Sequence, residues 1–567
     1  MYKKLWSIVL VFAMLFAVAA SAAAQTHVGA ATGYNAELKV EVDLDGTNIK
    51  DIRIVEDQES SPVKKRAFPL IIERILEAQT PQVDSVSGAT FSSFAVKTAV
   101  AEALKDAGIE VGAISFMPET AEGERQDLPA ADTSLLVVGG GPAGLSAAIQ
   151  AVQSGLNPSE VMVVEKLDIL GGNGKFDIVV FQHANTQAQK EAGIEDSADA
   201  LYEERKISAW DSDERLRKEA DVAVTMDEWY REMGIELNYV YDMRTHQAES
   251  DAYAGEALLD GLEKRVKELG IKVVTGTKAY DFIMDGSQLA GVKVQKGNEH
   301  YDIMADAVVV ATGGFCWNTE LLEKYTAEGS SLLRSSNQMG ATGDMVPLFE
   351  QYGFQLGHMD NTVVIGFMIS RGRELTGERV APQSTDYILV NKDGQRFTTE
   401  EVTYGLPRAM DVLAQPEGKA FMIVDQATVD FSFRIGKQAG EGLFLKADTL
   451  EELAEKLNIN GENLLKTAEV YNDAAAGKVK DAFRENAPSR PLNADGPYYG
   501  TQIESAMHMT KGGVSCDELA RCLDLHGEVI PGAYAAGEVT DTSGNFNQAF
   551  IFGRVAGEEA ARFILGK

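Results

Sequence analysis

The sequence predicts an α/β protein that is preceded by a small domain of the α+β type. Two strand-like runs and then a helix-like run come first, at residues 38–42, 49–55 and 91–107. Further along, strands alternate with a helix, as in a parallel sheet, at residues 135–138, 145–154 and 161–164. Between the two regions, residues 116–133 are polar, acidic and contain proline, which is typical of a connection between domains. We therefore expect separate cores before and after this connection.

Length and composition limit the class of protein. A chain of 567 residues is too long for one typical core, so we expect roughly two to four domains. The composition is that of a globular protein, with 45% hydrophobic and 24% charged residues. The formal net charge is −34 and would repel a phosphate backbone, which argues against a nucleic-acid partner.

The first 24 residues have the pattern of an export signal. Lys3 and Lys4 precede an uncharged apolar run, residues 5–20, and small residues then offer a cleavage site before Gln25. The alternative is a retained membrane anchor, but a helix of this length reaches about 24 Å, less than a hydrocarbon core of about 30 Å. We therefore expect residues 1–24 to be removed and the protein to be exported, to the periplasm or outside the cell.

Three cysteines, at positions 316, 516 and 522, make a poor disulfide framework for an exported protein. Cys516 and Cys522 could pair across a short hairpin or stay as buried free thiols, and Cys316 is expected to pack. None of the three lies in the Cys-x-x-Cys-His motif that attaches c-type haem. Electrons that reduce this protein must therefore come from outside the chain, and no metal site is expected.

Residues 84–90 read Asp-Ser-Val-Ser-Gly-Ala-Thr. This matches the Asp-x-x-Ser/Thr-Gly-Ala-Thr signal at which a flavin transferase esterifies the phosphate of FMN onto the final threonine. Small side chains before the threonine leave room for the phosphate donor, and the helix start can receive an anion. The alternative is an ordinary turn that enters a helix. Residues 25–118 resemble the FMN-binding domain of extracytoplasmic electron-transfer proteins, which implies covalent FMN on the threonine of a site formed by Asp84, Ser87, Gly88 and Thr90.

The glycine-rich turn after residues 135–138 carries a second signal. Gly139, Gly141 and Gly144 stand between a strand and a helix, and Glu165 follows the next strand, 21 residues past Gly144. Strand, turn, helix, strand and acid come in the order of a Rossmann dinucleotide site, where the turn accommodates a pyrophosphate and the acid accepts hydrogen bonds from a ribose. A lone glycine triplet would be weak evidence, but this order is specific.

Motifs after Glu165 resemble those of the fumarate reductase and succinate dehydrogenase flavoprotein family. They are Lys166 with Gly171-Gly172-Asn173, Ala311-Thr-Gly-Gly314, Asn337-Gln-x-Gly340-Ala-x-Gly343-Asp344, Met509-Thr-Lys-Gly512-Gly513-Val514 and Pro531-Gly-x-Tyr534-Ala-Ala-Gly537-Glu538-Val539. The resemblance covers residues 133–567 almost end to end. It implies non-covalent FAD in a Rossmann-type domain made of residues 133–361 and 510–567. An α+β capping domain at about 362–509 interrupts this domain, and residues 119–132 form the linker before it.

The same resemblance implies a set of FAD-binding residues. They are Gly139, Gly141, Ala143, Gly144, Glu165, Lys166, Gly172, Asn173, Gly174, Asp344, Glu538 and Ile551. An FMN domain fused to such a flavoprotein is the architecture of respiratory alkene reductases, among them urocanate reductases and soluble fumarate reductases. It implies that electrons pass from FMN to FAD and that a hydride then reduces an activated C=C bond, with a proton added at the neighbouring carbon.

The cap departs from the pattern of the fumarate reductases. Tyr404 stands where they have the arginine that donates the proton, and Arg408 is the alternative donor or a single-carboxylate anchor. Their dicarboxylate clamp aligns with Val380 and Gln383, and their C-terminal arginine is missing from residues 544–548. We therefore expect a larger, flatter and more apolar substrate. Its pocket is predicted to include Phe181, Phe367, His508 and Phe546, although each phenylalanine could instead belong to the core.

The leading hypothesis is an exported respiratory reductase of α,β-unsaturated compounds, such as an aromatic acrylate or an enone. It would need a flavin transferase for maturation and a membrane quinol dehydrogenase or a cytochrome as electron donor. One alternative is a desaturating dehydrogenase of the ketosteroid type, and another is a non-catalytic flavoprotein that only transfers electrons. Covalent FMN favours the reductase, because it suits the delivery of electrons from a membrane.

Overall fold

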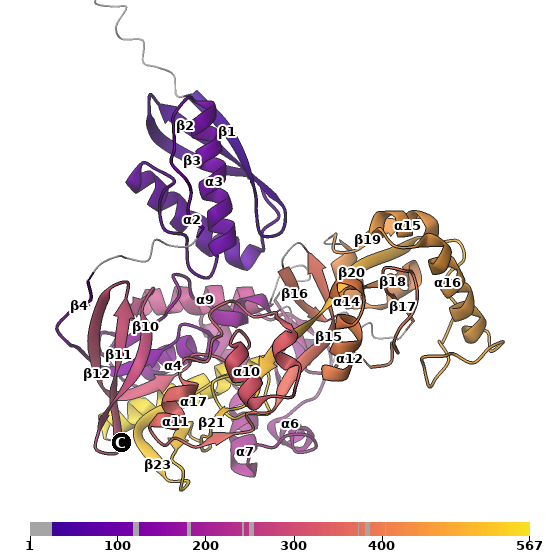
Figure 1. Cartoon of the computed structure of the whole chain (residues 1–567). Helices are drawn as coiled ribbons and strands as arrows, with labels where there is room; N and C mark the ends of the chain where they lie inside the picture. The colour runs from indigo at the N-terminus through magenta and orange to yellow at the C-terminus, as the bar shows by residue number, and fades with distance from the viewer. Residues whose placement is uncertain are drawn as a thin grey trace, which may run out of the picture. The chain divides into compact units, whose positions relative to one another are not determined.

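The structure of the protein is a computed structural model, which describes residues 25–116, 124–177, 183–240, 243–248, 254–371, 374–379, 386–402, 404–440 and 442–566. The chain forms two compact units, residues 1–122 and 123–567 (Figure 1). Their boundary falls inside the predicted linker, residues 119–132. The predicted export signal, residues 1–24, lies outside the described residues.

The first unit is a three-stranded antiparallel sheet covered by two helices. The strands are β1 (Gln25–Thr32), β2 (Glu37–Asp45) and β3 (Asn48–Glu56), in that order, and the helices are α2 (Ser61–Ala78) and α3 (Thr90–Asp106). Successive side chains of a strand point to opposite faces, so Leu38, Val40 and Val42 of β2 all enter the core. Helix α3 lies so close to β1 that a Cβ on Gly29 would stand 2.0 Å from the carbonyl oxygen of Ala99. The predicted small α+β domain is therefore present.

The second unit is built around a nine-stranded sheet. Six strands follow one another in the order β10-β11-β12-β5-β6-β9, while β23 and β4 pair with β12, and β22 pairs with β23. Their bounds are β4 (Gln126–Asp127), β5 (Ala131–Val138), β6 (Val161–Val164), β9 (Lys272–Val274), β10 (Lys278–Asp285), β11 (Gln288–Lys296), β12 (Glu299–Val310), β22 (Arg521–Leu523) and β23 (Val529–Ala535). Strands β5, β6 and β9 are parallel, and β23 pairs in parallel with the end of β12. The predicted α/β class is confirmed, and the sheet extends back into the predicted linker through β4 and the start of β5.

Two helices far apart in the sequence pack on this sheet as a pair. Helix α4 (Pro142–Gln153) connects β5 to β6, and α17 (Phe546–Leu565) packs against α4. A Cβ on Gly553 would lie 2.4 Å from the carbonyl oxygen of Ala143, and one on Gly557 would lie 2.2 Å from that of Ala147. Glycine is required for so close an approach of two helix backbones. The segments before and after the cap thus share one core.

A second sheet belongs mainly to the cap, with strands in the order β16-β15-β20-β18-β17 (Figure 1). Two more strands pair with β20, namely β19 and, from the segment before the cap, β13. The strands are β13 (Arg334–Ser335), β15 (Thr362–Arg371), β16 (Glu374–Arg379), β17 (Ile388–Val390), β18 (Ala420–Asp425), β19 (Leu445–Ala447) and β20 (Tyr498–Thr510). The helices are α12 (Leu406–Leu413), α13 (Gln426–Phe431), α14 (Phe433–Gly440), α15 (Leu450–Leu457) and α16 (Gly461–Ala475). A mixed sheet with its own helices is the α+β architecture predicted for the cap, and the long strands β15 and β20 connect it to the rest of the unit.

Further helices and short strands complete the second unit. The helices are α5 (Gln187–Glu191), α6 (Ala198–Arg205), α7 (Asp213–Ala223), α8 (Met226–Glu232), α9 (Ala254–Leu269), α10 (Thr319–Tyr325) and α11 (Val346–Gln351). The strands are β7 (Tyr239–Val240), β8 (His246–Gln247), β14 (Leu356–Gly357) and β21 (Gly513–Val514), and short 3-10 turns span Pro158–Glu160, Gly172–Phe176, Ser330–Leu332 and Pro416–Gly418.

The structure also shows the state of the cysteines and whether any described helix could cross a membrane. The three cysteines are free thiols, and Cys516 and Cys522 face each other across an antiparallel bridge. In the described part of the chain, no helix is both long enough and apolar enough to cross a membrane. In the same residues, no group of histidine, cysteine, aspartate and glutamate side chains is arranged to hold a metal ion.

Candidate functional site

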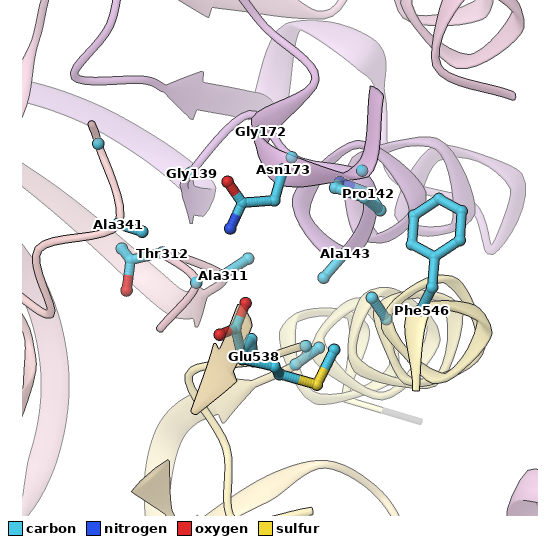
Figure 2. A pocket seen from close by; sticks show the side chains of 18 of the residues that line it. Gly139, Pro142, Ala143, Gly172, Asn173, Ala311, Thr312, Ala341, Glu538 and Phe546 are labelled. Atoms are coloured by element: carbon cyan, nitrogen blue, oxygen red, sulfur yellow. The ribbon is translucent and has the colours of Figure 1, made fainter. Parts of the chain in front are cut away.

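A cavity lies at the carboxyl edge of the nine-stranded sheet. The residues that directly follow β5, β6, β12 and β23 line it, namely Gly139, Glu165, Ala311 and Ala536. About 980 Å³ of space is not occupied by protein atoms there, including the part that is open to solvent. Figure 2 shows the side chains of Asn173 and Glu538 pointing into this space from opposite sides, with Phe546 beyond Ala143. Ligands of open α/β sheets bind at this edge, so the fold forms a cavity where the sequence predicts a dinucleotide.

The glycine turn shapes one wall of the cavity. Gly139 has φ +115°, which side chains rarely permit, and a Cβ there would lie 2.3 Å from the carbonyl oxygen of Ala311. A Cβ on Gly144, in the first turn of α4, would lie 1.9 Å from the carbonyl oxygen of Gly139. Gly144 therefore acts by letting α4 begin directly behind the turn. The N-terminal amides of α4 then stand at the cavity wall, where they favour a phosphate.

We expect Gly144→Ala to abolish FAD binding. The new methyl group would overlap a backbone oxygen, and relieving such a clash typically costs about 1–3 kcal/mol and would displace the turn. The measurement is the ratio of FAD to protein after acid extraction. Gly440→Ala is the matched control, because a Cβ at Gly440 meets no atom within 4 Å. A normal FAD content in the Gly144→Ala protein would contradict this account of the turn.

Glu165 is a hydrogen-bond acceptor held in place by the backbone. Its Oε2 accepts from the N–H of Gly140 at 2.8 Å, and its Oε1 accepts from the N–H of Leu167 at 2.9 Å. Burial raises the pKa of Glu165, and these two donors oppose the rise. A carboxylate fixed at the cavity wall can accept hydrogen bonds from ribose hydroxyls.

Glu538 and Asn173 bring polar groups into the cavity from two other segments. Oε1 of Glu538 accepts from the N–H of Thr510 at 3.0 Å and from its hydroxyl at 3.3 Å. Burial raises the pKa of Glu538 to about 6, although these donors stabilise the charged form. The side-chain amide of Asn173 donates to Oδ1 of Asn337 at 2.8 Å, and its oxygen accepts from the N–H of Gln338 at 3.0 Å. The motifs that were distant in the sequence therefore meet at one site.

Asp344 does not line this cavity, but it lines a smaller one beside it, together with Gly139, Glu165 and Lys166. It forms ion pairs with Lys166 at 2.7 Å and with Lys278 at 3.0 Å. Burial raises the pKa of Asp344, but the two lysines outweigh this effect and hold the pKa below its usual value. Lys166 lines the cavity, so Asp344 holds one of its lining side chains. The predicted contact of Asp344 with FAD stays a prediction.

Most of the predicted FAD-binding residues meet at the cavity. Those that line it are Gly139, Gly141, Ala143, Glu165, Lys166, Gly172, Asn173, Gly174 and Glu538. Ile551 lies apart from them, buried on α17 in the core that α4 and α17 share. Packing between these helices accounts for the apolar residue at this position.

Two residues of the predicted substrate pocket lie at or beside the cavity. Phe546 lines it, and the ring of Phe546 packs edge-on against that of Phe550, with ring centroids 4.9 Å apart. His508 precedes Met509, another lining residue, and Nδ1 of His508 lies 2.8 Å from the hydroxyl oxygen of Ser336. The aromatic ring at the start of α17 is therefore part of the wall that a bound ligand meets.

Of the other two residues of that predicted pocket, the structure describes only Phe367. Phe367 is fully buried in the hydrophobic core of the cap, among residues such as Tyr387 and Ile503, and it does not line the cavity. Packing accounts for Phe367. Phe181 lies outside the described residues, as do Val380 and Gln383.

The predicted proton donors lie around the start of α12 in the cap. Tyr404 forms an antiparallel bridge with Ile365 of β15, and 36% of its surface is exposed. Arg408 donates to the hydroxyl of Thr398 and forms an ion pair with Asp411 at 2.9 Å. Neither residue lines the cavity, so their catalytic roles stay predictions.

In the first unit, the predicted FMN signal forms the turn that enters α3. Gly88 has φ +89°, and Thr90 is the first residue of the helix and is half-buried. Arg74 of α2 donates to the carbonyl oxygens of Asp84 and Ser85, each at 3.1 Å. The turn is thus held in a defined shape, and the Thr90 hydroxyl belongs to a helix N-terminus, which favours a phosphate anion.

A buried lysine holds the same segment from the interior. Nζ of Lys97 donates to the carbonyl oxygen of Val83 at 2.8 Å and to that of Ser115 at 2.9 Å. Only 1% of Lys97 is exposed, and burial lowers its pKa. Ser87, next to Gly88, is half-buried. The chain on either side of α3 is therefore tied to one side chain that the sequence analysis did not single out.

Other contributors to the cavity were also missed as individual residues. Thr510, Thr312 and Gln338 line it, but the sequence indicated them only as parts of larger motifs. The signal for Thr510 was its place in Met509-Thr-Lys-Gly512. Lys511, the next residue, is almost fully buried, which no pattern of apolar residues could reveal.

The Rossmann sheet, the glycine turn and the acid at the cavity wall define an FAD-binding flavoprotein, and the α+β unit in front adds a second flavin domain. The family profile described as "FAD binding domain" matches residues 134–550, and the one described as "FMN-binding domain" matches residues 33–105. The chain belongs to the fumarate reductase and urocanate reductase family of FMN- and FAD-binding flavoproteins.

Individual relatives agree with this assignment. The chain is 31% identical to an NADH:fumarate oxidoreductase of Klebsiella pneumoniae over 94% of its own length, but it spans only 58% of that protein. It is 30% identical to a urocanate reductase of Eggerthella lenta, over 96% of this chain and 93% of that protein. In fold it is similar to the open conformation of a flavocytochrome c3 fumarate reductase. The TM-score is 0.68, at 28% identity over 77% of this chain and 79% of the other.

Proposed function

We propose that the chain is an exported flavoprotein reductase of C=C bonds. Electrons enter at FMN carried on Thr90, pass to FAD, and leave as a hydride to an α,β-unsaturated acceptor. The presence of both flavin domains in one chain supports this proposal, as do relatives described as fumarate and urocanate reductases. A flavin transferase would load the FMN, and a membrane quinol dehydrogenase or a cytochrome would donate the electrons in the periplasm or outside the cell.

We further propose that the acceptor is aromatic or apolar rather than a dicarboxylate, and the charge of the cavity carries this choice. Among the described residues that line the cavity, Lys166 is the only cation, and it adjoins Glu165 at the predicted ribose site. Away from that end, the described lining residues include the carboxylates Asp177 and Glu538 but no cation, and the uncharged side chains include Met509, Asn545, Phe546, Gln548 and Ala549. Two buried carboxylates need charged partners, whereas an aromatic ring gains from aromatic and apolar neighbours.

The described residues have distinct tasks in this reaction. FAD, when bound, supplies the hydride chemistry. The glycine turn and the start of α4 bind a pyrophosphate, and Glu165 holds a ribose. Phe546 and Met509 keep water from the part of the cavity that they line. The acceptor also needs a proton, which we assign to the Tyr404 hydroxyl, with Arg408 as the alternative. A phenol of pKa about 10 can protonate an enolate within hydrogen-bond reach.

We expect fumarate to be a poor acceptor. Its second carboxylate would stand in a site without a matching cation, and an unpaired buried charge typically costs several kcal/mol, or about 10²-fold or more in rate. The test supplies reduced methyl viologen as donor and compares kcat/KM for fumarate, urocanate, cinnamate-type acrylates, vinyl phenols and cyclic enones. We expect the best aromatic or apolar acceptor to exceed fumarate by about 10²-fold.

The same panel separates the alternative functions. Efficient turnover of fumarate at low concentration would contradict the choice of acceptor but not the reductase. Oxidation of saturated ring ketones with an artificial electron acceptor, without reduction of any alkene, would indicate a dehydrogenase of the ketosteroid type. No turnover in either direction, with both flavins bound and reducible, would indicate a protein that only transfers electrons.

A further inference from the structure

A buried cation stands directly behind the cavity wall. Lys511 follows Thr510, a lining residue, and is only 7% exposed. Its Nζ donates to the carbonyl oxygen of Ser543 at 3.1 Å, to that of Gly544, and to Oδ1 of Asn545 at 3.2 Å. Gly544 and Asn545 line the cavity. One ammonium group therefore holds the whole turn that leads into α17.

The charge of Lys511 is not neutralised by a direct ion pair among the described residues. All three partners of its Nζ are neutral oxygens. The charged groups that face it are Arg205, Glu538, Asp211 and Glu219. Each of these carboxylates has other partners: Glu538 accepts from Thr510, Asp211 pairs with Arg215 at 3.1 Å, and Glu219 pairs with Arg205 at 3.2 Å.

Burying an ammonium group without a carboxylate partner costs free energy, so a buried lysine of this kind is expected to have a function that needs its charge. Burial lowers the pKa of Lys511 to about 8, with the nearby Arg205 adding to the effect. A cation that is nine-tenths buried, without a carboxylate partner and next to a ligand cavity, is the kind of group that functional sites retain.

The cavity indicates which part of a bound dinucleotide would lie nearest to Lys511. Glu165 marks the ribose of the adenosine half, and the turn at Gly139 marks the pyrophosphate. Past Ala143 the cavity continues toward Phe546 at the start of α17, and the rest of an FAD molecule would lie in this part (Figure 2). This part of the wall includes Gly544 and Asn545, which Lys511 holds. The flavin ring end of the site therefore adjoins the lysine.

The geometry of the turn strengthens this positive field. In a trans peptide the N–H points away from the C=O, so the carbonyl of Gly544 facing Lys511 leaves the N–H of Asn545 directed away from it. The next residue, Phe546, begins α17, a helix of 20 residues whose N-terminus carries partial positive charge. The ammonium and the helix start thus act on the same side of the cavity.

We propose that Lys511 holds the Ser543–Asn545 turn in place and that its positive charge stabilises the negative charge that bound FAD gains on reduction. FAD takes up two electrons from the donor and one proton from solvent, so the bound cofactor gains one negative charge. A cation near the ring favours that state and raises the midpoint potential. This role is independent of which acceptor the protein reduces.

The test measures the midpoint potential of FAD in variants that separate charge from shape. Lys511→Gln and Lys511→Met remove the charge, and Lys511→Arg keeps it. The titrations use dithionite and the full-length Thr90→Ala protein, so that covalent FMN does not interfere. We expect Lys511→Gln and Lys511→Met to weaken the preference for reduced FAD at least about tenfold, which lowers the potential by about 30 mV. Lys511→Arg should stay within about threefold of the parent.

Two controls separate this effect from damage to the fold. Each variant is first checked for its FAD content and its Tm. Lys293→Gln removes a lysine of β11 that pairs with Asp281 at 2.8 Å on the surface of the same unit, and it should leave the potential unchanged. Unchanged potentials in Lys511→Gln and Lys511→Met proteins that retain FAD would overturn the proposal.

If those variants lose FAD, the protein with the native Lys511 provides the test. The quantity measured is then the pH dependence of the midpoint potential of FAD. Reduction raises the pKa of the lysine above its value in the oxidised protein. Above pH 8, reduction should therefore take up a second proton. Each proton taken up with the two electrons changes the equilibrium between oxidised and reduced FAD tenfold per pH unit, or about 30 mV. The slope of the midpoint potential against pH should therefore double above about pH 8. A slope that stays at one proton through this range would refute the electrostatic role.

Discussion

Replacing Thr90 with alanine should eliminate covalently bound FMN and leave the first unit folded. The proposed attachment atom is the Thr90 hydroxyl, at the first position of α3. Nearby hydroxyls are engaged in other contacts: that of Ser92 donates to Glu59, and that of Ser93 accepts from the N–H of Val86 at 3.2 Å. The measurements are flavin fluorescence of the denatured protein in a gel and the mass of the peptide that contains residues 84–90.

The matched control for this substitution lies two turns along the same helix. The hydroxyl of Thr98 donates to the carbonyl oxygen of Phe94 at 2.8 Å, so Thr98→Ala should keep a full complement of FMN. Thr90→Ser retains a hydroxyl and should be labelled at least in part. We also expect the Thr90→Ala protein to lose reduction by a membrane donor while dithionite still reduces its FAD. Undiminished labelling of the Thr90→Ala protein would show that FMN is attached elsewhere.

The second large effect is expected for Tyr404→Phe, which removes one hydroxyl and keeps the ring. If this hydroxyl protonates the product, its loss should slow reoxidation of FAD by the alkene about 10²–10⁴-fold, or about 3–5 kcal/mol of activation free energy. Reduction of FAD by the donor should not change, because that half-reaction needs no acid from the cap. Single-turnover mixing with the best acceptor of the panel resolves the two steps. Because Tyr404 is partly exposed, the substitution should leave folding and FAD content intact.

Another tyrosine of the cap provides the control for Tyr404. Tyr498 donates its hydroxyl to the carbonyl oxygen of Asn493 at 2.5 Å and does not line the cavity, so Tyr498→Phe should reoxidise at the normal rate. If Tyr404→Phe also reoxidises at the normal rate, Tyr404 is not the acid. Arg408 then becomes the candidate, and it would first have to leave its ion pair with Asp411.

The FAD-binding domain could be predicted from the sequence because backbone geometry restricts the residues that form it. A turn with φ +115° at Gly139 and a contact of 1.9 Å behind Gly144 admit glycine alone, so the glycines stand in the sequence as a readable pattern. Local propensities also sufficed for β2, β3 and α3 of the first unit, but β1 and α2 were not predicted. Asp344 was predicted from its motif to contact FAD, and its ion pair with Lys166 is a further relation that only the tertiary structure reveals.

The structure places the predicted substrate residues in different surroundings, and the sequence could not show this for a physical reason. An aromatic side chain has the same hydrophobic character in a core and in a pocket, so the sequence could not distinguish Phe367, buried in the cap, from Phe546, at the cavity. The burial of Lys511 was equally invisible. Its partners lie more than thirty residues away along the chain. Two of them are backbone oxygens, which every residue has, so the residue types at those positions do not reveal the contact.

The pairing of α4 with α17 has a consequence for biosynthesis. The wall formed by Ala536, Glu538 and Phe546 is translated after the entire cap, whereas the glycine turn is translated before it. On the ribosome, the first unit can therefore fold while most of the chain is still unmade. The FAD cavity can close only when β23 and α17 arrive to pack on β12 and α4. A chain interrupted within the cap would emerge with a complete FMN domain but with only half of its FAD site.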